Sequence, residues 1–293
     1  MKTNTFNATV ICLCCGLLFC QLTACSTFYP DTSIPAYISV DSVPFSCNYQ
    51  NYGSSSANIT DLWAYSNNNP AGVYDVPALF PLLNQGSTLM QFSAGIIENG
   101  ISNTRAIYPF YTYDTVTVNI QPNHTTSIIP HFTYRSGTIM ALKEDFENGN
   151  AFKSYQSSAV MARVSGPNVF EGGYSGYINL TTDTSNYQGI TSSSWELPTQ
   201  TAVYLELNYM CNIPFNIGLR GIVSAGDTLT PINYFLGVNP VNIWNKMYVN
   251  LTPYIAEANA SGAVTYQIAI DAELPAGSTS GQVYLDNIKL VHF

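Results

Sequence analysis

Three aromatic side chains in the second half of the chain are candidates for holding a sugar: Tyr174, Tyr187 and Trp195. Proteins bind pyranose rings by stacking them on aromatic faces and by hydrogen bonding their hydroxyls to polar side chains. Tyr174 and Tyr187 stand near glycines in expected loops, where binding residues concentrate. Trp195 has polar residues on both sides, so either face of a strand is open to it. The alternative for each is an ordinary core or surface aromatic, and Trp244, which precedes a strand, is expected in the core.

Residue patterns for catalysis are few. The run GYSGY at residues 173–177 misses the G-x-S-x-G nucleophile elbow, because Tyr177 replaces the last glycine and no helical pattern follows. The sequence has no H-E-x-x-H motif. Glu144, Asp145 and Glu147 cluster in one segment, whereas glycosidases need carboxylates that face each other across a cleft. We therefore expect a protein that is not an enzyme.

The start of the chain has the order of a cleaved secretory signal. Lys2 provides a basic region, residues 10–19 form an apolar run too short to span a bilayer, and Leu-Thr-Ala at 22–24 precedes Cys25. This stretch resembles the lipobox of bacterial lipoproteins, in which the cysteine is diacylated, with palmitate-type chains, and becomes the first residue. The resemblance implies a signal peptide over residues 1–24 and a lipid anchor on Cys25, hence a cell-envelope protein, expected at the outer membrane. The alternative is an ordinary signal peptide followed by a chance cysteine.

Length and charge narrow the function further. Removing 24 of the 293 residues leaves 269, enough for two domains, and the loss of Lys2 takes the formal charge from −9 to −10. So acidic a chain repels phosphates, which excludes nucleic acid as a partner. Only 9% of residues are charged while Tyr numbers 21, a composition common in exported β-proteins.

Cysteine and histidine offer little metal chemistry. Four of the seven cysteines leave with the signal and Cys25 is the lipid site, so only Cys47 and Cys211 remain. They form no CxxC or Cys/His cluster, which argues against zinc. We expect two free buried thiols. A disulfide between them would require the two domains to dock closely.

The first half of the mature chain predicts a small β-sandwich over residues 36–135, after a short tether at 25–35. Residues 36–43 alternate apolar and polar positions, the period of a half-buried strand. Turn residues separate further runs of this kind, as in a sandwich. The further strands are expected at residues 59–65, 72–76, 88–94, 115–121 and 127–134.

Residues 61–113, from DLWAYSNNNPAG through PALFPLL to NGISNTRAIYPFY, resemble the N-terminal region of uncharacterised lipoproteins from Bacteroidota-type bacteria. They are also similar to the small prealbumin-like or PEGA-type modules of surface proteins. The resemblance implies kinship and location. It carries no catalytic residues.

The second half, residues 139–293, follows a boundary at Arg135-Ser136-Gly137-Thr138. The opening DFE at 145–147, WNKMYVNLT at 244–252 and GQVYLDNIKLV at 281–291 together resemble galactose-binding-like jelly rolls, the scaffold of many carbohydrate-binding modules. In that fold the first and last strands lie near each other. Strands are expected at residues 159–164, 174–180, 203–210, 215–223, 246–251, 264–272 and 282–291, with a helical turn at 253–258.

The jelly-roll resemblance also implies a structural Ca²⁺ held by the opening segment and the last strand. Glu147 and Asp286 stand at the corresponding places, with Asp145 as a further carboxylate. Calcium takes about six to eight oxygens, so carbonyls around residues 172–175 would have to complete the set. The alternative is that these carboxylates lie at the surface or cap turns.

The sequence thus predicts an all-β protein with two β-sandwich domains in series, an Ig- or prealbumin-like sandwich followed by a jelly roll. We expect a non-catalytic, lipid-anchored envelope protein whose jelly roll binds a glycan. Two alternatives stay open: a structural or adhesive surface subunit that contacts an envelope protein, and an accessory subunit or remnant of a polysaccharide hydrolase.

Overall fold

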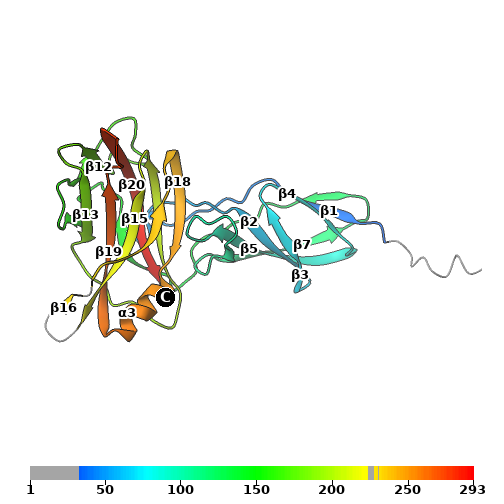
Figure 1. Ribbon diagram of the computed structural model, residues 1–293. Helices are drawn as coiled ribbons and strands as arrows, with labels where there is room; N and C mark the ends of the chain where they lie inside the picture. The colour runs from blue at the N-terminus through cyan, green and yellow to red at the C-terminus, as the bar shows by residue number, and fades with distance from the viewer. Residues whose placement is uncertain (1–32, 224–227, 230) are drawn as a thin grey trace, which may run out of the picture.

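A computed structural model describes residues 33–223, 228–229 and 231–293 of the chain (Figure 1). The expected signal peptide and Cys25 lie outside these described residues. The described chain is all-β, with only two short helices, α2 (Tyr49–Tyr52) and α3 (Thr252–Ala260). Neither is long and apolar enough to cross a membrane.

The first half is a small sandwich of two sheets. A three-stranded sheet has the order β4-β1-β8, in which β1 pairs antiparallel with β4 and parallel with β8. A five-stranded sheet has the order β3-β2-β5-β6, with β7 also paired to β5. Apolar side chains alternate along β1 and meet Phe80 and Phe92 in a shared core. The strands are β1 (Ala36–Val40), β2 (Asp61–Ser66), β3 (Asn69–Asp75), β4 (Ala78–Leu82), β5 (Gly86–Ile97), β6 (Arg105–Ile107), β7 (Tyr113–Ile120) and β8 (Thr125–Ser127).

The second half is a larger sandwich, built from two six-stranded sheets. The β13 sheet has the order β10-β13-β19-β15-β16, with β17 also on β15. Its strands are β10 (Phe152–Ser154), β13 (Asn186–Thr191), β15 (Phe215–Val223), β16 (Thr228–Leu229), β17 (Asn233–Val238) and β19 (Ala263–Glu273).

The β20 sheet has the order β11-β12-β20-β14-β18, with β9 also on β20. The first and last strands of this half are therefore paired, as the jelly-roll resemblance implies. Its strands are β9 (Ile139–Glu144), β11 (Met161–Val164), β12 (Ser175–Thr181), β14 (Val203–Cys211), β18 (Val241–Asn250) and β20 (Ser280–His292).

Several details differ from the sequence prediction. The strands β4 and β9 and the short β6, β10 and β16 were not predicted. The strand expected at residues 127–134 is only β8, and the rest of that stretch joins the core through isolated bridges. The strands β13 and β17 were not predicted, because their glycines and tyrosines gave no clear alternation. Cys47 is half-buried and Cys211 is buried, and both are free thiols.

The two halves share a buried interface. Tyr204, Tyr248 and Val291 of the β20 sheet pack into the hydrophobic core of the first half. The hydroxyls of Tyr111 and Tyr248 lie 2.9 Å apart across the junction. Figure 1 shows the two halves end to end, with β18 facing the first half. This packing fixes one sandwich against the other.

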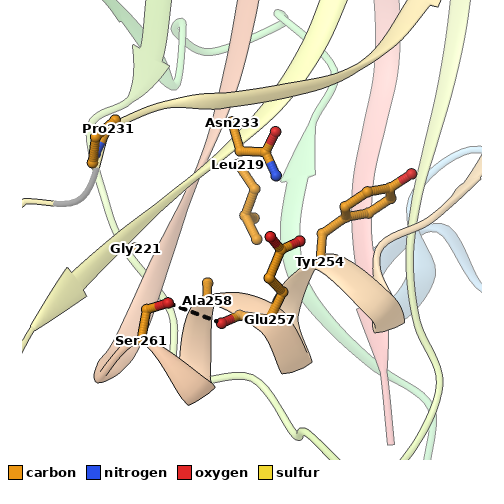
Figure 2. Close-up of a pocket in the computed structure, with 8 residues that line it drawn as sticks. All are labelled: Leu219, Gly221, Pro231, Asn233, Tyr254, Glu257, Ala258 and Ser261. Carbon is orange, nitrogen blue, oxygen red and sulfur yellow. Dashed lines mark hydrogen bonds between the residues drawn. The ribbon is translucent and has the colours of Figure 1, made fainter.

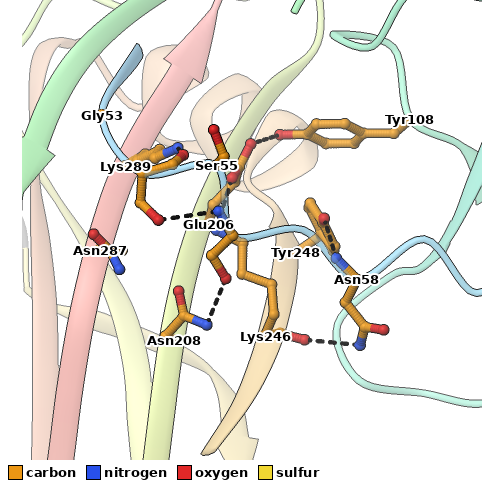
Figure 3. A network of polar contacts seen from close by, with 12 residues as sticks. Gly53, Ser55, Asn58, Tyr108, Glu206, Asn208, Lys246, Tyr248, Asn287 and Lys289 are labelled. Carbon is orange, nitrogen blue, oxygen red and sulfur yellow. Dashed lines mark hydrogen bonds and ion pairs between the residues drawn. The ribbon is translucent and has the colours of Figure 1, made fainter. Parts of the chain in front are cut away.

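A charged network lies inside this interface (Figure 3). The fully buried carboxylate of Glu206 on β14 pairs with Lys246 Nζ at 2.8 Å and accepts hydrogen bonds from Tyr108 Oη at 2.7 Å and Tyr134 Oη at 2.8 Å. Lys289 Nζ donates to the carbonyl oxygen of Ser54 at 2.6 Å. Burial alone would raise the pKa of Glu206, but the two lysines outweigh it and the net shift is downward. The network is therefore charged and almost fully paired.

Candidate functional site

Tyr187 does not contact the surface. It lies on β13, points into the core between the two sheets and is fully buried. Its ring cannot stack on a ligand, so the expectation of a sugar contact at Tyr187 is wrong. The cause is local: a tyrosine beside a glycine looked like a loop residue, whereas both belong to a strand.

Tyr174 is 40% exposed, but one face of its ring is covered. The guanidinium of Arg163 lies 4.3 Å from the ring centroid and also donates to the carbonyl oxygens of Phe146 and Glu147. Trp195 is half-buried and packs against the core of the second half, where its backbone pairs with Tyr266. The structure does not bring Tyr174 and Trp195 into one binding site with Tyr187.

The carboxylates expected to bind calcium serve the protein instead. Glu147 Oε1 accepts hydrogen bonds from the backbone N–H groups of Gly173 and Tyr174 at 2.8 and 3.0 Å. Asp286 is buried and accepts from Ser175 Oγ at 2.6 Å and from the N–H of Asn287 at 2.8 Å. Burial raises the pKa of Asp286 to about 7.

Hydrogen-bond donors that would compete with a metal ion thus occupy both oxygens of Asp286 and one oxygen of Glu147. Within the described ranges, no group of three or more His, Cys, Asp or Glu side chains could hold a metal. The residues present do not fit the calcium site that the resemblance implies.

A groove crosses the outer face of the β13 sheet. Along β15 the side chains of Phe215, Ile217 and Leu219 point into the core, so Gly218 and Arg220 face outward. A hollow of about 270 Å³ opens above them. It is lined by Tyr155, Gln156, Gln188, Arg220, Pro231, Ile232 and Tyr234.

Glycine at position 218 makes room for the wall of this groove. A Cβ atom there would come within 2.7 Å of the Tyr234 ring and 2.9 Å of the Asn233 carbonyl oxygen. The ring of Tyr234 therefore lies directly over the strand. On the same outer face, Asn216 Nδ2 donates to Asp271 Oδ2 at 3.0 Å.

Two polar atoms of the groove are buried without a partner. Arg220 Nε and Tyr234 Oη have no partner within ordinary hydrogen-bond geometry. The Gln188 amide lies near enough to the Tyr234 hydroxyl to lower its pKa slightly, but not in a geometry that satisfies it. Burial and the charge of Asp271 raise the pKa of Tyr234 to about 12, so its hydroxyl stays protonated and can donate. Buried polar groups are nearly always satisfied, so this pair points to a ligand or to water.

A second hollow, of about 200 Å³, lies between α3 and the inner side of β15 (Figure 2). Leu219, Tyr254 and Ala258 make it largely apolar, and the Glu257 carboxylate points into it. It shares Pro231 with the groove, but Leu219 and Arg220 point to opposite faces of the strand. The two hollows are therefore separate.

A third aromatic group lies on the outer face of the β20 sheet and contains Trp244, which is half-buried there and does not lie in the core as predicted. The rings of Tyr177 and Tyr284 contact each other at a tilt, with their centroids 4.7 Å apart, and Trp244 contacts Tyr284 and Phe170. Amides already satisfy the hydroxyls of both tyrosines, from Gln282 at 2.9 Å and from Asn168 at 3.0 Å. This cluster therefore has less need of a ligand than the groove.

The histidines give no sign of nucleophilic catalysis. His124 Nδ1 and His292 Nδ1 each contact a backbone carbonyl. Over the ranges that the structure covers, no histidine ring is hydrogen bonded to a serine or a carboxylate. The base-and-nucleophile arrangement of hydrolases is thus not seen there.

No protein-family model and no curated protein matches the chain. Among solved structures, a family 11 carbohydrate-binding module from a cellulosomal cellulase of Clostridium thermocellum is 16% identical, with 53% of this chain and 95% of that chain covered and a TM-score of 0.39. A xylan-binding domain of family 22 is 14% identical, covering 53% and 96%, with a TM-score of 0.35.

An adhesin domain of Lys-gingipain from Porphyromonas gingivalis is 13% identical, covering 53% and 99%, with a TM-score of 0.35. All three similarities are below 25% identity, so they concern the fold alone. TM-scores below 0.5 assign no function, and the function must rest on the groove itself.

Proposed function

We propose that the second half binds carbohydrate in the groove of the β13 sheet and does not turn it over. The observation that carries this proposal is the pair of buried, unpartnered polar atoms, Arg220 Nε and Tyr234 Oη, in a hollow walled by an aromatic ring. An unsatisfied buried group costs about 1–3 kcal/mol, which a ligand's hydroxyls can recover. Gln156 and Gln188 add amides that both donate and accept.

The chemistry of the groove favours a sugar over a protein partner. Protein-contact sites present an apolar patch or a free sheet edge. Here the lining is amide, phenol and guanidinium around a concave hollow, with Pro231 and Ile232 as its apolar rim. This mixture suits the hydroxyls and C–H faces of a pyranose.

Titration of the whole chain with a panel of neutral and uronate-bearing oligosaccharides, followed by calorimetry, tests the proposal. We expect saturable binding to at least one oligosaccharide, weakened about tenfold or more by Tyr234→Ala, since truncating a central aromatic contact typically costs over 1 kcal/mol. Tyr174→Ala is the control, because its ring lies outside the groove, and it should leave the affinity unchanged. A folded protein that binds nothing in the panel would refute the proposal.

The proposal extends to the cellular location of the protein. The lipobox-like stretch that ends at Cys25 supports it. Acyl chains on this cysteine would hold the protein at the cell envelope, at the outer membrane, with the first sandwich as a stalk. In a bacterial host, Cys25→Ala should abolish labelling by radioactive palmitate and release the protein from the membrane fraction. Unchanged labelling would contradict the anchor.

A further inference from the structure

Arg220 is a buried cation that forms no ion pair with any carboxylate among the described residues. Arg220 is only 5% exposed. It is one of only nine Lys and Arg residues in the chain. It makes no ion pair and no side-chain hydrogen bond with any residue that the structure describes. A buried, unpaired charge is strongly unfavourable, so its retention calls for a cause.

The surrounding residues position the guanidinium without pairing it. Its Cζ lies 4.6 Å from the centroid of the Tyr155 ring, a cation–π contact. The Tyr155 N–H donates to the Gln188 carbonyl at 2.7 Å, which ties that ring to β13. Asp271 is on the same outer face, yet its carboxylate accepts from Asn216 and forms no ion pair with Arg220. Arg220 thus lines the hollow with its Nε–H buried and unpartnered.

Three other basic side chains show which partners this protein usually provides for a positive charge. Arg163 also stacks on a tyrosine, but both its Nε and Nη2 donate to backbone carbonyls at 2.5 Å. The buried Lys246 and Lys289 surround the carboxylate of Glu206. Arg220 departs from both patterns. The simplest source of the missing hydrogen-bond acceptor for its guanidinium is a ligand from outside the chain.

We propose that Arg220 binds the carboxylate of an acidic sugar residue, which makes the groove a site for uronate-containing glycans. This inference rests on the proposed function. The planar guanidinium edge matches a carboxylate in a way that a hydroxyl does not, and the charge-assisted bond is about twice as strong as a neutral one. A hollow of about 270 Å³ is small beside ligand pockets of roughly 300–1,000 Å³ and suits one sugar residue.

The negative net charge of the protein narrows the range of acidic glycans that the groove can bind. A chain of charge −9 repels dense polyanions at long range, whereas one isolated carboxylate meets chiefly the local field of Arg220. The site should therefore prefer glycans with sparse uronates over heavily sulfated ones.

The test titrates the whole chain with matched pairs of oligosaccharides. Aldotetraouronic acid, which carries one uronate on xylotriose, digalacturonate and the glucuronate–N-acetylglucosamine disaccharide are each compared with the same sugar after reduction of its carboxyl to an alcohol. We expect at least one acid to bind tenfold or more tightly than its reduced form. Arg220→Met should abolish that preference, and Arg220→Lys should restore part of it.

Thermal melting separates a binding role from a structural one. Since Arg220→Met removes an unpaired buried charge, the melting temperature should stay equal or rise while the acid preference disappears. Arg163→Met is the matched control, a stacked arginine outside the groove, and should keep the preference.

Four other outcomes would contradict the inference. Equal binding of acid and reduced sugars would overturn the inference and leave carbohydrate binding standing. Loss of the preference with a markedly lower melting temperature, unrelieved by Arg220→Lys, would assign Arg220 a structural role and overturn it. Binding of a sulfated oligosaccharide in place of the uronates would overturn the inference that Arg220 binds a carboxylate. A folded protein that binds no oligosaccharide would refute the proposed function as well.

Discussion

Arg220 and Tyr234 lie in the groove because the alternation of β15 and the pairing of β17 aim them outward. Arg220 Nε and Tyr234 Oη are buried there without a partner of ordinary hydrogen-bond geometry. Such positions trade stability for function, since a replacement that only improves packing would remove the groups that a ligand needs. The same reasoning separates Tyr234 from Tyr177 and Tyr284, whose hydroxyls the protein satisfies itself.

A pH dependence follows from Asp286. Its usual pKa of 3.8 rises to about 7 in the folded protein, chiefly through burial and also through the charge of Glu171. Between these two values the folded state keeps a proton that the unfolded chain has lost, so this group's contribution to stability falls as the pH rises from about 4 to 7. The slope is at most about 1.4 kcal/mol per pH unit.

Urea unfolding of the wild type and of Asp286→Asn from pH 4 to 8 measures this effect. The stability of the variant relative to the wild type should increase with pH and level off above about pH 7. A difference that does not change with pH would show that Asp286 is ionised throughout.

At the residue scale, burial was the part that the sequence could not supply. Tyr187 and Tyr234 look alike in the sequence, each a tyrosine close to a glycine in a stretch without clear alternation. One is fully buried and the other lines the groove, because the pairing of distant strands decides which face is covered. The alternation of Asn216, Gly218 and Arg220 with apolar residues was the signal that could have revealed the outer face.

At the scale of elements, the wall of the groove depends on how closely β17 approaches β15. Gly218→Ala should force the Tyr234 ring and the β17 backbone away, at a cost of about 1–3 kcal/mol, and should weaken glycan binding. Gly237→Ala on β17 is the matched control, since its nearest neighbour would be Asn216 Oδ1 at 3.4 Å. Equal effects of the two substitutions on unfolding and affinity would contradict this close approach.

Elements with a clear period were predictable, and short irregular ones were not. The expected strand at residues 215–223 coincides with β15, and the helical turn expected at 253–258 is α3. The proline at its start fixes a helical φ where no hydrogen-bond donor is needed. By contrast, β10 and β16 have only three and two residues, and their pairing comes from neighbouring strands.

At the scale of the molecule, the interface and the groove occupy opposite faces of the second sandwich. The first half packs on the outer face of the β20 sheet, whereas the groove lies on the outer face of the β13 sheet. The shared core and the network of Glu206 hold this arrangement, so the groove faces away from the first half. Strand β14 accordingly has almost no exposed residue. If its outer face were open to solvent, every second residue of the strand would be exposed.

The network of Glu206 should therefore be required for the two halves to act as one body. Glu206→Gln leaves Lys246 and Lys289 without their buried counter-charge, a loss of about 3–5 kcal/mol in the free energy of unfolding. Glu98→Gln is the control at the rim of the same interface, where a half-buried carboxylate accepts from Tyr204 Oη and Asn250 Nδ2 and the amide can still accept. We expect that change to cost about 1 kcal/mol or less.

Denaturant unfolding of both variants, followed by tyrosine fluorescence, compares the two. If Glu206→Gln also splits one transition into two, the charged network is what couples the sandwiches. If it falls within about 1 kcal/mol of Glu98→Gln, the junction does not depend on the buried charge. The aromatic packing of Tyr108, Tyr204 and Tyr248 and the remaining hydrogen bonds between the halves then hold it.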